Sequence, residues 1–287
     1  MIKGSTKVFS VIGDPIEHTL SPKLHNTLIK ELNHDAVYVP LHVRKDNLND
    51  AIRGAHALGI IGMNVTIPHK ENVMDSIISV DPIAKQIGAV NTLKYTDKGY
   101  KGYNTDADGL LQSLEYEGVS IKDQVVVILG AGGASRAVAI LCASRGAKKI
   151  IIMNRTIRKA EELAFLVKQY YQVDIEIYPI NSPLLEKKVD LCIQTTSVGM
   201  YPHVNNLIVE DDEFYKKVQI AVDLIYNPSE TMFLKKCKKN GARTLNGLGM
   251  LVYQGIKSYE IWNEVNITKS VKNKIYEELK NYLKRGL

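Results

Sequence analysis

A cluster of glycines near the middle of the chain has the spacing of a phosphate-binding turn. Gly130, Gly132 and Gly133 follow the apolar run Val125–Leu129 and precede a segment of small and apolar residues. A buried strand, a tight turn and a helix in this order present backbone N–H groups and the positive end of the helix dipole to a diphosphate. Gly130 would permit the tight turn and Gly132 the approach of the ligand, while Ser135 replaces the Gly or Ala of the usual fingerprint. The sequence therefore predicts a dinucleotide site, with a plain strand-to-helix turn as the alternative.

The segment after the next apolar run bears on which dinucleotide is bound. The run Lys149–Met153 predicts a second strand, which ends in Asn154-Arg155-Thr156. An NAD site usually places an acidic residue here to bind the ribose hydroxyls, and this chain has none. Arg155, Arg158 and Lys159 suit the 2′-phosphate of NADP, because a guanidinium grips phosphate with paired hydrogen bonds. A solvated helix start is the alternative, but cations there oppose the helix dipole. The pattern favours NADP.

Length and composition are those of a soluble protein of two domains. The chain has 287 residues, of which 45% are hydrophobic and 24% charged, which allows more than one core. No apolar run approaches the roughly 20 residues of a membrane span, and the first residues lack the apolar core of a signal peptide. Cys142, Cys192 and Cys237 are scattered, with no CxxC pair. We therefore expect a cytoplasmic protein with reduced thiols, no membrane association and no metal site.

The positive charge has a simpler explanation than nucleic-acid binding. The net charge is +6, and its densest cluster is Lys235–Lys239, near the end of a predicted helix where cations complement the dipole. No basic stripe interleaved with aromatic residues accompanies this cluster. We expect the charge to aid solubility and to attract anionic small molecules, without a nucleic-acid partner.

A turn rich in hydroxyl groups follows the first apolar run. Val8–Ile12 predicts a strand, and Ser21 before Pro22 predicts the N-cap and first residue of a helix. Capping alone would explain Ser21. Thr19 and Ser21, two hydroxyls beside a helix N-terminus, would also accommodate a carboxylate.

Two charged residues stand at the ends of further predicted strands. Lys70 lies where the chain turns from one strand toward the next helix, and Asp106 follows a hairpin that turns at Asp97–Gly99. Asp106 could cap a helix over Asp108–Glu117 that connects the two domains. Alternatively, Asp108 could cap that helix and leave Asp106 free for chemistry. A lone Lys in such a position is most often a solvated surface residue.

The last third of the chain predicts alternating strands and helices. Short strands are expected at Ile220–Asp223 and Arg243–Leu245, separated by a helix over Thr231–Asn240. A helix begins at Leu248 and carries an apolar face, and an amphipathic helix follows over Thr268–Leu283.

A series of short segments resembles the shikimate dehydrogenases, in which they occur in the same order. The segments are HTLSPKLHN (18–26), NVTIPHKE (64–71), GAVNTL (88–93), GYNTDADG (102–109), GAGGASRA (130–137), NRT (154–156), TTSVGM (195–200), DLIYNP (223–228) and NGLGMLVYQG (246–255). The match extends from about residue 8 to residue 260, and the chain resembles the NADP-preferring members of the family. NVTIPHKE and GLGMLVYQ are specific to this family rather than to dinucleotide binding in general.

The resemblance implies an activity and a fold. Family members use NADPH to reduce 3-dehydroshikimate reversibly to shikimate, in the shikimate pathway of aromatic amino-acid biosynthesis. The implied fold is α/β with two domains. An N-terminal substrate domain with a mixed sheet would span residues 1–106 and be completed by C-terminal helices at 247–287. A Rossmann-like, doubly wound NADP-binding domain with a linker helix would span residues 107–246.

The resemblance also assigns roles to individual residues. Lys70 and Asp106 would form the catalytic pair, since an alkoxide formed by hydride transfer needs a proton donor within hydrogen-bond reach. The substrate would contact Thr19, Ser21, Thr66, Lys70, Asn91, Asp106, Tyr226 and Gln254, of which Thr19, Ser21 and Tyr226 would hold its carboxylate. The cofactor would contact Gly130, Ala131, Gly132, Gly133, Ala134, Asn154, Arg155, Thr156, Lys159, Thr195, Ser197, Val198, Gly247 and Met250. Because Gln254 should reach the substrate, the final helices should return to the N-terminal domain.

Departures from the family pattern leave alternatives open. Thr19 stands where Ser is common and narrows the pocket, which bears on the choice between shikimate and quinate. Lys159 stands where an Arg often holds the 2′-phosphate, so the preference for NADP could be weaker. An NAD-linked quinate/shikimate dehydrogenase and a non-catalytic ligand sensor on the same fold are the alternatives. The chain is expected to be a monomer or homodimer, with hinges near Thr105–Gly109 and Asn246–Gly249.

Overall fold

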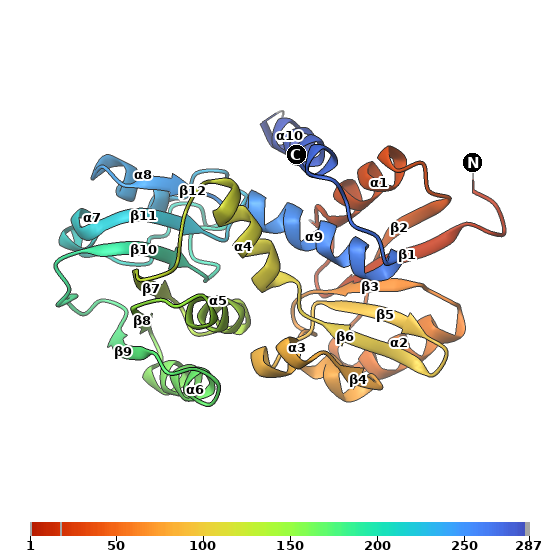
Figure 1. Cartoon of the computed structure of the whole chain (residues 1–287), viewed down its shortest axis with the longest axis horizontal. Coiled ribbons are helices and arrows are strands. Elements are labelled where there is room, and N and C mark those ends of the chain that lie inside the picture. The colour runs from red at the N-terminus through yellow and green to blue at the C-terminus, as the bar shows by residue number, and fades with distance from the viewer. Residues whose placement is uncertain (1, 18, 285–287) are drawn as a thin grey trace. The chain divides into compact units, whose positions relative to one another are not determined.

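The chain folds into two compact units and crosses from one unit to the other within two helices. The computed structural model describes residues 2–17 and 19–284. Unit 1 comprises Met1–Gly109 and Leu251–Leu287, and unit 2 comprises Leu110–Met250 (Figure 1). The chain passes between the units within α4 (Asp106–Tyr116) and again within α9 (Leu248–Asn263).

Unit 1 is built on a mixed six-stranded sheet with the order β2-β1-β3-β5-β6-β4. The strands are β1 (Lys7–Gly13), β2 (Ala36–His42), β3 (Gly62–Val65), β4 (Ser79–Val80), β5 (Thr92–Thr96) and β6 (Gly99–Tyr103). β1 pairs in parallel with β2 and β3, whereas β5 pairs antiparallel with β3 and β6. The helices are α1 (Ser21–Glu31), α2 (Leu48–Ala57), α3 (Pro82–Ile87) and α10 (Lys269–Lys284), with 3₁₀ turns at Lys45–Asn47 and Asn72–Ser76.

Aromatic packing brings the helix α9 back onto this sheet. Trp262 stacks on Phe9 of β1 with ring centroids 5.0 Å apart, and its indole N–H donates to the carbonyl of Leu93 at 2.9 Å. A side chain at Gly62 of β3 would overlap the Trp262 ring, so the helix lies against the strand only because that residue is glycine. This contact fixes the face of α9 that carries Gln254 and Ser258.

Unit 2 is a doubly wound parallel sheet with the order β12-β11-β10-β7-β8-β9. The strands are β7 (Val125–Leu129), β8 (Lys149–Asn154), β9 (Asp174–Pro179), β10 (Val189–Gln194), β11 (Val218–Asp223) and β12 (Arg243–Leu245), and every neighbouring pair is parallel. The helices are α5 (Gly133–Ser144), α6 (Ile157–Lys168), α7 (Asp212–Lys217) and α8 (Met232–Lys239). The chain moves outward from β7 in one direction and then from β10 in the other. The switch point, where such sheets bind ligands, therefore lies between β7 and β10.

The two-domain α/β fold predicted from the sequence is confirmed, and most predicted elements lie within a few residues of their observed bounds. Two helix starts differ from prediction. The N-cap of α1 is Leu20 rather than Ser21, which is the first helical residue and makes no capping hydrogen bond. α4 begins at Asp106 rather than Asp108. Ser21 and Asp106, which could have served as caps, are thus the first residues inside their helices.

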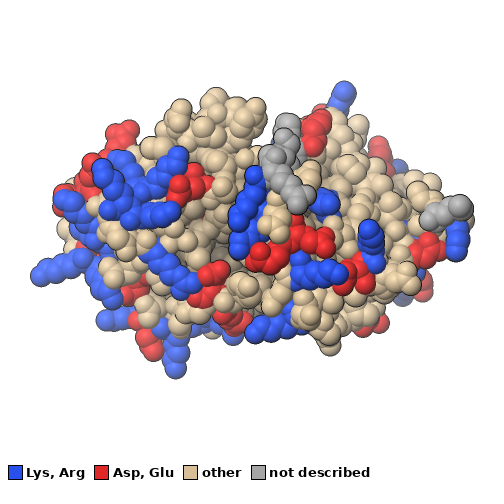
Figure 2. Space-filling model, turned by 90° about the horizontal axis from the view of Figure 1, so that it is seen from above, with Lys and Arg blue, Asp and Glu red and all other residues tan. Residues whose placement is uncertain are grey.

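Charged side chains of both signs are interspersed over the face drawn in Figure 2. Within the predicted basic cluster on α8, Lys236 pairs with Asp212 at 2.6 Å and Lys238 with Glu230 at 3.1 Å. No helix in residues 2–17 and 19–284 is both long and apolar enough to cross a membrane. In the same residues, no group of three or more His, Cys, Asp or Glu is placed to hold a metal ion.

Candidate active site

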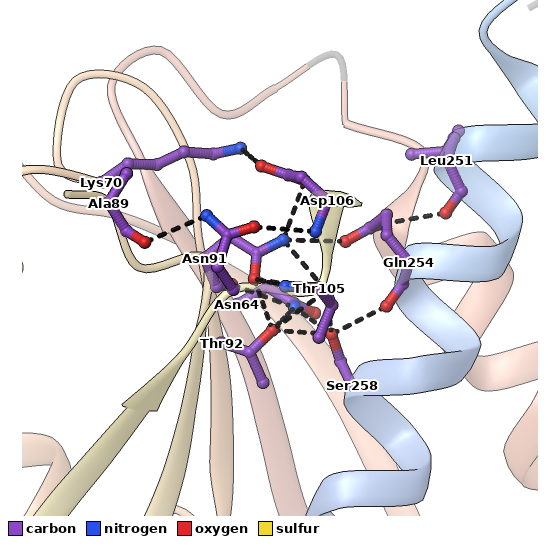
Figure 3. Close-up of polar contacts among 11 residues, drawn as sticks. Asn64, Lys70, Ala89, Asn91, Thr92, Thr105, Asp106, Leu251, Gln254 and Ser258 are labelled. Carbon is purple, nitrogen blue, oxygen red and sulfur yellow. Dashed lines mark hydrogen bonds and ion pairs between the residues drawn. The ribbon is translucent and has the colours of Figure 1, made fainter. Parts of the chain in front are cut away.

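Lys70 and Asp106 form an ion pair in unit 1. Nζ of Lys70 lies 2.6 Å from Oδ2 of Asp106 (Figure 3), and the Asp106 side chain is 8% exposed against 24% for Lys70. Lys70 lies in the turn after β3, where its carbonyl accepts a hydrogen bond from the N–H of Val90. The ammonium is thus held beside a buried carboxylate while it keeps contact with solvent.

The side-chain amide of Asn104 fixes the backbone of Asp106. The side-chain oxygen of Asn104 accepts from the N–H of Asp106 at 3.0 Å, and its side-chain nitrogen donates to the carbonyl of Ala89 at 3.0 Å. Asn104 therefore does for the start of α4 what a capping side chain does, so the carboxylate of Asp106 need not cap its own helix. That carboxylate is left to face Lys70.

The orientation of the Asn91 side chain follows from a backbone donor. Oδ1 of Asn91 accepts from the N–H of Thr105 at 2.9 Å, and Nδ2 donates to Oδ1 of Asp106 at 2.8 Å (Figure 3). Because a backbone N–H can only donate, the amide oxygen must face Thr105 and the amide nitrogen must face Asp106. Asp106 thus receives one donor on each carboxylate oxygen, Lys70 on Oδ2 and Asn91 on Oδ1.

Gln254 reaches the same cluster from α9. Its Oε1 lies 3.4 Å from Nδ2 of Asn91, and its Nε2 donates to the carbonyl of Leu251 at 2.9 Å. The predicted return of the C-terminal helix to the N-terminal unit is therefore present. Lys70, Asn91, Asp106 and Gln254, predicted from segments far apart in the chain, form one hydrogen-bonded group.

Thr19 and Ser21 form a hydroxyl pair at the start of α1. The Thr19 hydroxyl donates to Oγ of Ser21 at 3.2 Å, and the N–H of Ser21 donates back to Thr19 at 3.3 Å. The two hydroxyl groups therefore lie side by side at the start of α1. Thr66 lies at the end of β3, where its N–H donates to the carbonyl of Ile12. A side chain at Gly13 would come within 2.5 Å of the Thr66 methyl group, so that glycine makes room for Thr66.

Tyr226 belongs to unit 2, in the loop after β11. Burial raises the pKa of its phenol. The loop is held by Asp223, whose carboxylate accepts from the N–H of Ile225 at 2.9 Å and from the hydroxyl of Thr231 at 2.6 Å. Burial raises the pKa of Asp223 to about 6, which these two hydrogen bonds oppose. Tyr226 is thus presented by an ordered turn.

The glycine turn in unit 2 has the geometry that a diphosphate requires. Gly130 has a φ of 113°, and a side chain there would come within 2.7 Å of both Thr195 and Thr196. At Gly132, by contrast, a side chain would meet nothing within 4 Å. The first turn of α5, which includes Ala134, adds N–H groups that have no partner within the helix. The turn therefore fits a dinucleotide diphosphate, with Gly130 needed for its shape and Gly132 for access.

Ser135 ties this turn to the loop after β10. Its hydroxyl accepts from the N–H of Gly132 at 3.0 Å and lies 2.7 Å from the hydroxyl of Thr195. The Thr195 hydroxyl donates to the carbonyl of Leu129 at 2.7 Å, so the proton between the two hydroxyls comes from Ser135. The exception to the usual fingerprint thus has a structural reason. The hydroxyl proton of Thr195 is itself donated to a backbone carbonyl, that of Leu129.

The cations after β8 differ in their engagement. Arg158 donates to Glu162 one helical turn later at 3.0 Å, whereas Arg155 and Lys159 are exposed and no ion pair is found for either within residues 2–17 and 19–284. Asn154 donates through Nδ2 to the carbonyl of Thr156 at 2.8 Å and so shapes the turn. Arg155 and Lys159 therefore suit a phosphate better than Arg158 does.

The remaining predicted cofactor contacts also lie in unit 2. The carbonyl of Val198 accepts from the side chain of Gln194 at 3.0 Å, which orders the segment containing Ser197. The N–H of Gly247 donates to the carbonyl of Ile225 at 3.0 Å, and a side chain at Gly247 would overlap the backbone of Leu224. Glycine is therefore required at 247 by packing alone. Met250 is partly exposed.

Sequence reasoning missed several polar residues that support these groups. They are Asn64, Thr92, Asn104, Thr105 and Ser258, and all belong to unit 1. The available signal was polarity within otherwise apolar strands and helices, as for Asn64 in the wholly buried strand GMNV.

The comparisons with known proteins agree on one family. A family model described as the shikimate dehydrogenase substrate binding domain matches residues 11–93, and one described as shikimate / quinate 5-dehydrogenase matches residues 112–225. The chain is 41% identical to a "Shikimate dehydrogenase (NADP(+))" of Caldanaerobacter subterraneus, with 97% of this chain and 98% of that protein covered. It is 43% identical to the protein of the same name from Methanocaldococcus jannaschii, with coverage of 97% and 99%.

A solved structure supports the same relationship. A shikimate dehydrogenase crystallised in complex with NADP+ superposes with a TM-score of 0.87 at 42% identity, and 97% of each chain is covered. Identity at this level over nearly the full length, together with the shared fold, shows that the chain belongs to the shikimate dehydrogenase family.

Proposed function

We propose that this protein catalyses the reversible reduction of 3-dehydroshikimate to shikimate with NADPH. The observation that carries the proposal is the buried array of Lys70, Asp106 and Asn91, which can transfer a proton to and from a substrate oxygen. The names of the relatives and the fit of unit 2 to a dinucleotide support the redox half of the reaction.

Lys70 is the proton donor in the direction of reduction. Bound NADPH supplies the hydride that reaches the carbonyl carbon. The carbonyl oxygen then gains negative charge, and the Lys70 ammonium gives it a proton, forming the alcohol and leaving a neutral amine. Asp106 already accepts hydrogen bonds from Lys70 and Asn91, so it orients the ammonium and can accept a bond from the substrate hydroxyl. The partly exposed Lys70 side chain recovers its proton from solvent.

Unit 1 binds the substrate in this proposal. Thr19 and Ser21 place two hydroxyl groups at the carboxylate, with Tyr226 as a third, and the Thr19 proton would turn from Ser21 to the ligand. Each charge-assisted hydrogen bond contributes about 1.5–3 kcal/mol. Asn91, Thr66 and Gln254 bind the ring hydroxyls beside Lys70 and Asp106. The match of residues 11–93 to a substrate-binding family model supports this assignment.

Unit 2 binds NADP in this proposal. The N–H groups of the turn Gly130–Ala134 hold the diphosphate, and Arg155, Thr156 and Lys159 hold the 2′-phosphate. The segment from Thr195 to Val198, with Gly247 and Met250, lies against the nicotinamide. Arg155 and Lys159, which are exposed and have no ion pair within residues 2–17 and 19–284, support NADP over NAD.

An assay that crosses two substrates with two cofactors tests the proposal. Oxidation of shikimate or quinate is followed by the absorbance of NADPH or NADH. Shikimate with NADP+ should give the highest kcat/KM, by at least about tenfold over either single exchange. A higher value for quinate with NAD+ would replace this assignment with a quinate/shikimate dehydrogenase. Binding of shikimate without turnover would indicate a ligand sensor.

The protein is further proposed to work in the cytoplasm as a monomer or homodimer. Its buried, unpaired thiols support a reducing compartment. Light scattering after size exclusion would give the oligomeric state.

A further inference from the structure

Ser258 lies on α9 one turn after Gln254 and is completely buried against the strands that carry the site (Figure 3). Its hydroxyl donates to the carbonyl of Gln254 at 3.0 Å. A serine has one proton to donate, and this bond uses it. Every other polar contact of the Ser258 oxygen must therefore come from a donor on the neighbouring group.

Two such donors come from the sheet. Nδ2 of Asn64 donates to Ser258 at 3.0 Å, and the hydroxyl of Thr92 lies 2.8 Å away. With the Ser258 proton committed to Gln254, the Thr92 hydroxyl is the donor. Asn64 is itself held by the hydroxyl of Tyr38, which donates to its Oδ1 at 2.7 Å. Ser258 thus joins helix α9 to β3 and β5 through two buried donors.

The surroundings of Asn91 show what depends on Ser258. Besides Ser258, the Thr92 hydroxyl lies 3.4 Å from the hydroxyl of Thr105 and 2.9 Å from Oδ1 of Asn91. That oxygen also accepts from the N–H of Thr105 at 2.9 Å, and the hydroxyl of Thr105 lies 3.2 Å away. An amide oxygen accepts two hydrogen bonds, and the N–H of Thr105 already sets its side, so the orientation of Asn91 does not depend on Ser258. What depends on Ser258 is the position of α9 against β3 and β5, and the Ser258 hydroxyl holds the carbonyl of Gln254 in that helix.

We propose that Ser258 is a positioning residue for the substrate site. It sets the position of the helix turn that presents Gln254 against β3 and β5, without touching substrate. The inference rests on the proposed function, because its effect is read through binding of shikimate.

Replacement of Ser258 by Ala removes the acceptor on α9, and the donors of Asn64 and Thr92 are then left with acceptors in and beside the strands of unit 1. Loss of two buried hydrogen bonds between α9 and the sheet corresponds to a weakening of about 10-fold to 100-fold in binding that depends on the position of Gln254. We expect the KM for shikimate to rise by about that factor in Ser258→Ala, with a smaller change in kcat. The KM for NADP+ should be unchanged, because the proposed dinucleotide contacts belong to unit 2.

Ser10→Ala is the matched control. Ser10 lies in β1 of the same unit, is completely buried, and its hydroxyl has no hydrogen-bond partner in the part of the chain that is described. Ser10→Ala should keep both KM values. Thr92→Val removes the donor while leaving Ser258 in place, and should raise the KM for shikimate in the same way, even where Ser258→Ala fails to fold.

A double mutant separates positioning from a general loss of structure. In a Gln254→Ala background, Ser258→Ala should lower kcat/KM by less than about threefold further, because its effect runs through Gln254. Full additivity, or equal KM values for Ser258→Ala and Ser10→Ala in an active enzyme, would overturn the positioning role. Wild-type protein that is inactive on shikimate would instead overturn the proposed function, and the two failures are therefore distinct.

Discussion

Nζ of Lys70 lies 2.6 Å from Oδ2 of Asp106, although the two residues are 36 positions apart in the chain. Each is held by its own backbone contacts, Lys70 through Val90 and Asp106 through Asn104. The pair is therefore preorganised, because the backbone of each residue is held by contacts other than the ion pair itself. Preorganised donors contribute most where charge develops during a reaction.

Lys70→Ala removes the proposed proton donor. We expect kcat for shikimate oxidation to fall by about 10²–10⁴-fold, because a positioned acid–base group contributes about that much. The affinity for NADPH, measured by fluorescence titration, should change less than about twofold, since Lys70 lies in unit 1. A variant with near wild-type kcat would show that Lys70 does not transfer the proton.

Arg155→Ala should weaken the preference for NADP. Loss of a charge-assisted bond to the 2′-phosphate should raise the KM for NADPH by about 10-fold to 100-fold. The KM for NADH, which lacks that phosphate, should be nearly unchanged. Arg158→Ala is the matched control, because Arg158 already pairs with Glu162, and it should alter neither constant by more than about twofold. Equal effects of the two substitutions would contradict the assignment.

Gly132→Ala and Gly130→Ala should fail in different ways. A methyl group at Gly132 meets nothing within 4 Å, so the variant should fold with an unchanged melting temperature but bind NADPH weakly. A methyl group at Gly130 would approach Thr195 and Thr196 to 2.7 Å, and the φ there is 113°, so that variant should lose stability as well. Thermal unfolding and NADPH titration of both variants give the comparison. Normal NADPH binding by Gly132→Ala would remove the diphosphate from this turn.

His25→Phe should reduce the sensitivity of unit 1 to acid. Burial lowers the pKa of His25 from 6.5 to about 3, an effect that Asn64 opposes in part. The unfolded chain therefore binds a proton below pH 6.5 that the folded chain does not, and stability is lost as the pH falls from that value. Between pH 7.5 and pH 5 the wild type should lose about 2 kcal/mol that the variant keeps.

Urea unfolding provides the measurement for His25→Phe. The chain has a single tryptophan, Trp262, whose ring centroid lies 5.2 Å from that of His25, so its fluorescence reports on this core. Phe can keep the stacking on Tyr38, where the ring centroids are 4.2 Å apart. Identical pH dependence of the two proteins would show that His25 is not the group responsible.

The continuous apolar run Val125–Leu129, buried at all but its first residue, has the predicted bounds. Arg243–Leu245 also has the predicted bounds, although it is a partly exposed strand at the edge of the sheet. The strand β9 was not predicted, because Asp174–Pro179 alternates charged and apolar residues at a sheet edge. A continuous apolar run signals burial on both faces, whereas an edge strand resembles a loop in composition.

The residues of the site were accessible to sequence reasoning only in part. Lys70, Asn91, Asp106 and Gln254 come from segments typical of the family, and the structure joins them by hydrogen bonds. The prediction that Ser21 caps α1 was wrong, since Leu20 already has helical dihedral angles and Ser21 lies inside the helix. The role of Ser258 could not be read from its neighbours in sequence, because its side-chain partners Asn64, Thr92 and Thr105 lie 153 to 194 positions away in the chain. Local pattern cannot identify partners at that distance.

The three cysteines of the folded protein should react slowly with thiol reagents. Cys142, Cys192 and Cys237 are all buried, and burial raises the pKa of the Cys142 and Cys237 thiols to about 12. The thiolate is the reactive species, so alkylation must wait for an opening of unit 2. The rate of labelling by a maleimide or a disulfide reagent therefore measures how often unit 2 opens. Because saturating NADPH should slow this labelling, the native cysteines report cofactor occupancy without an engineered probe.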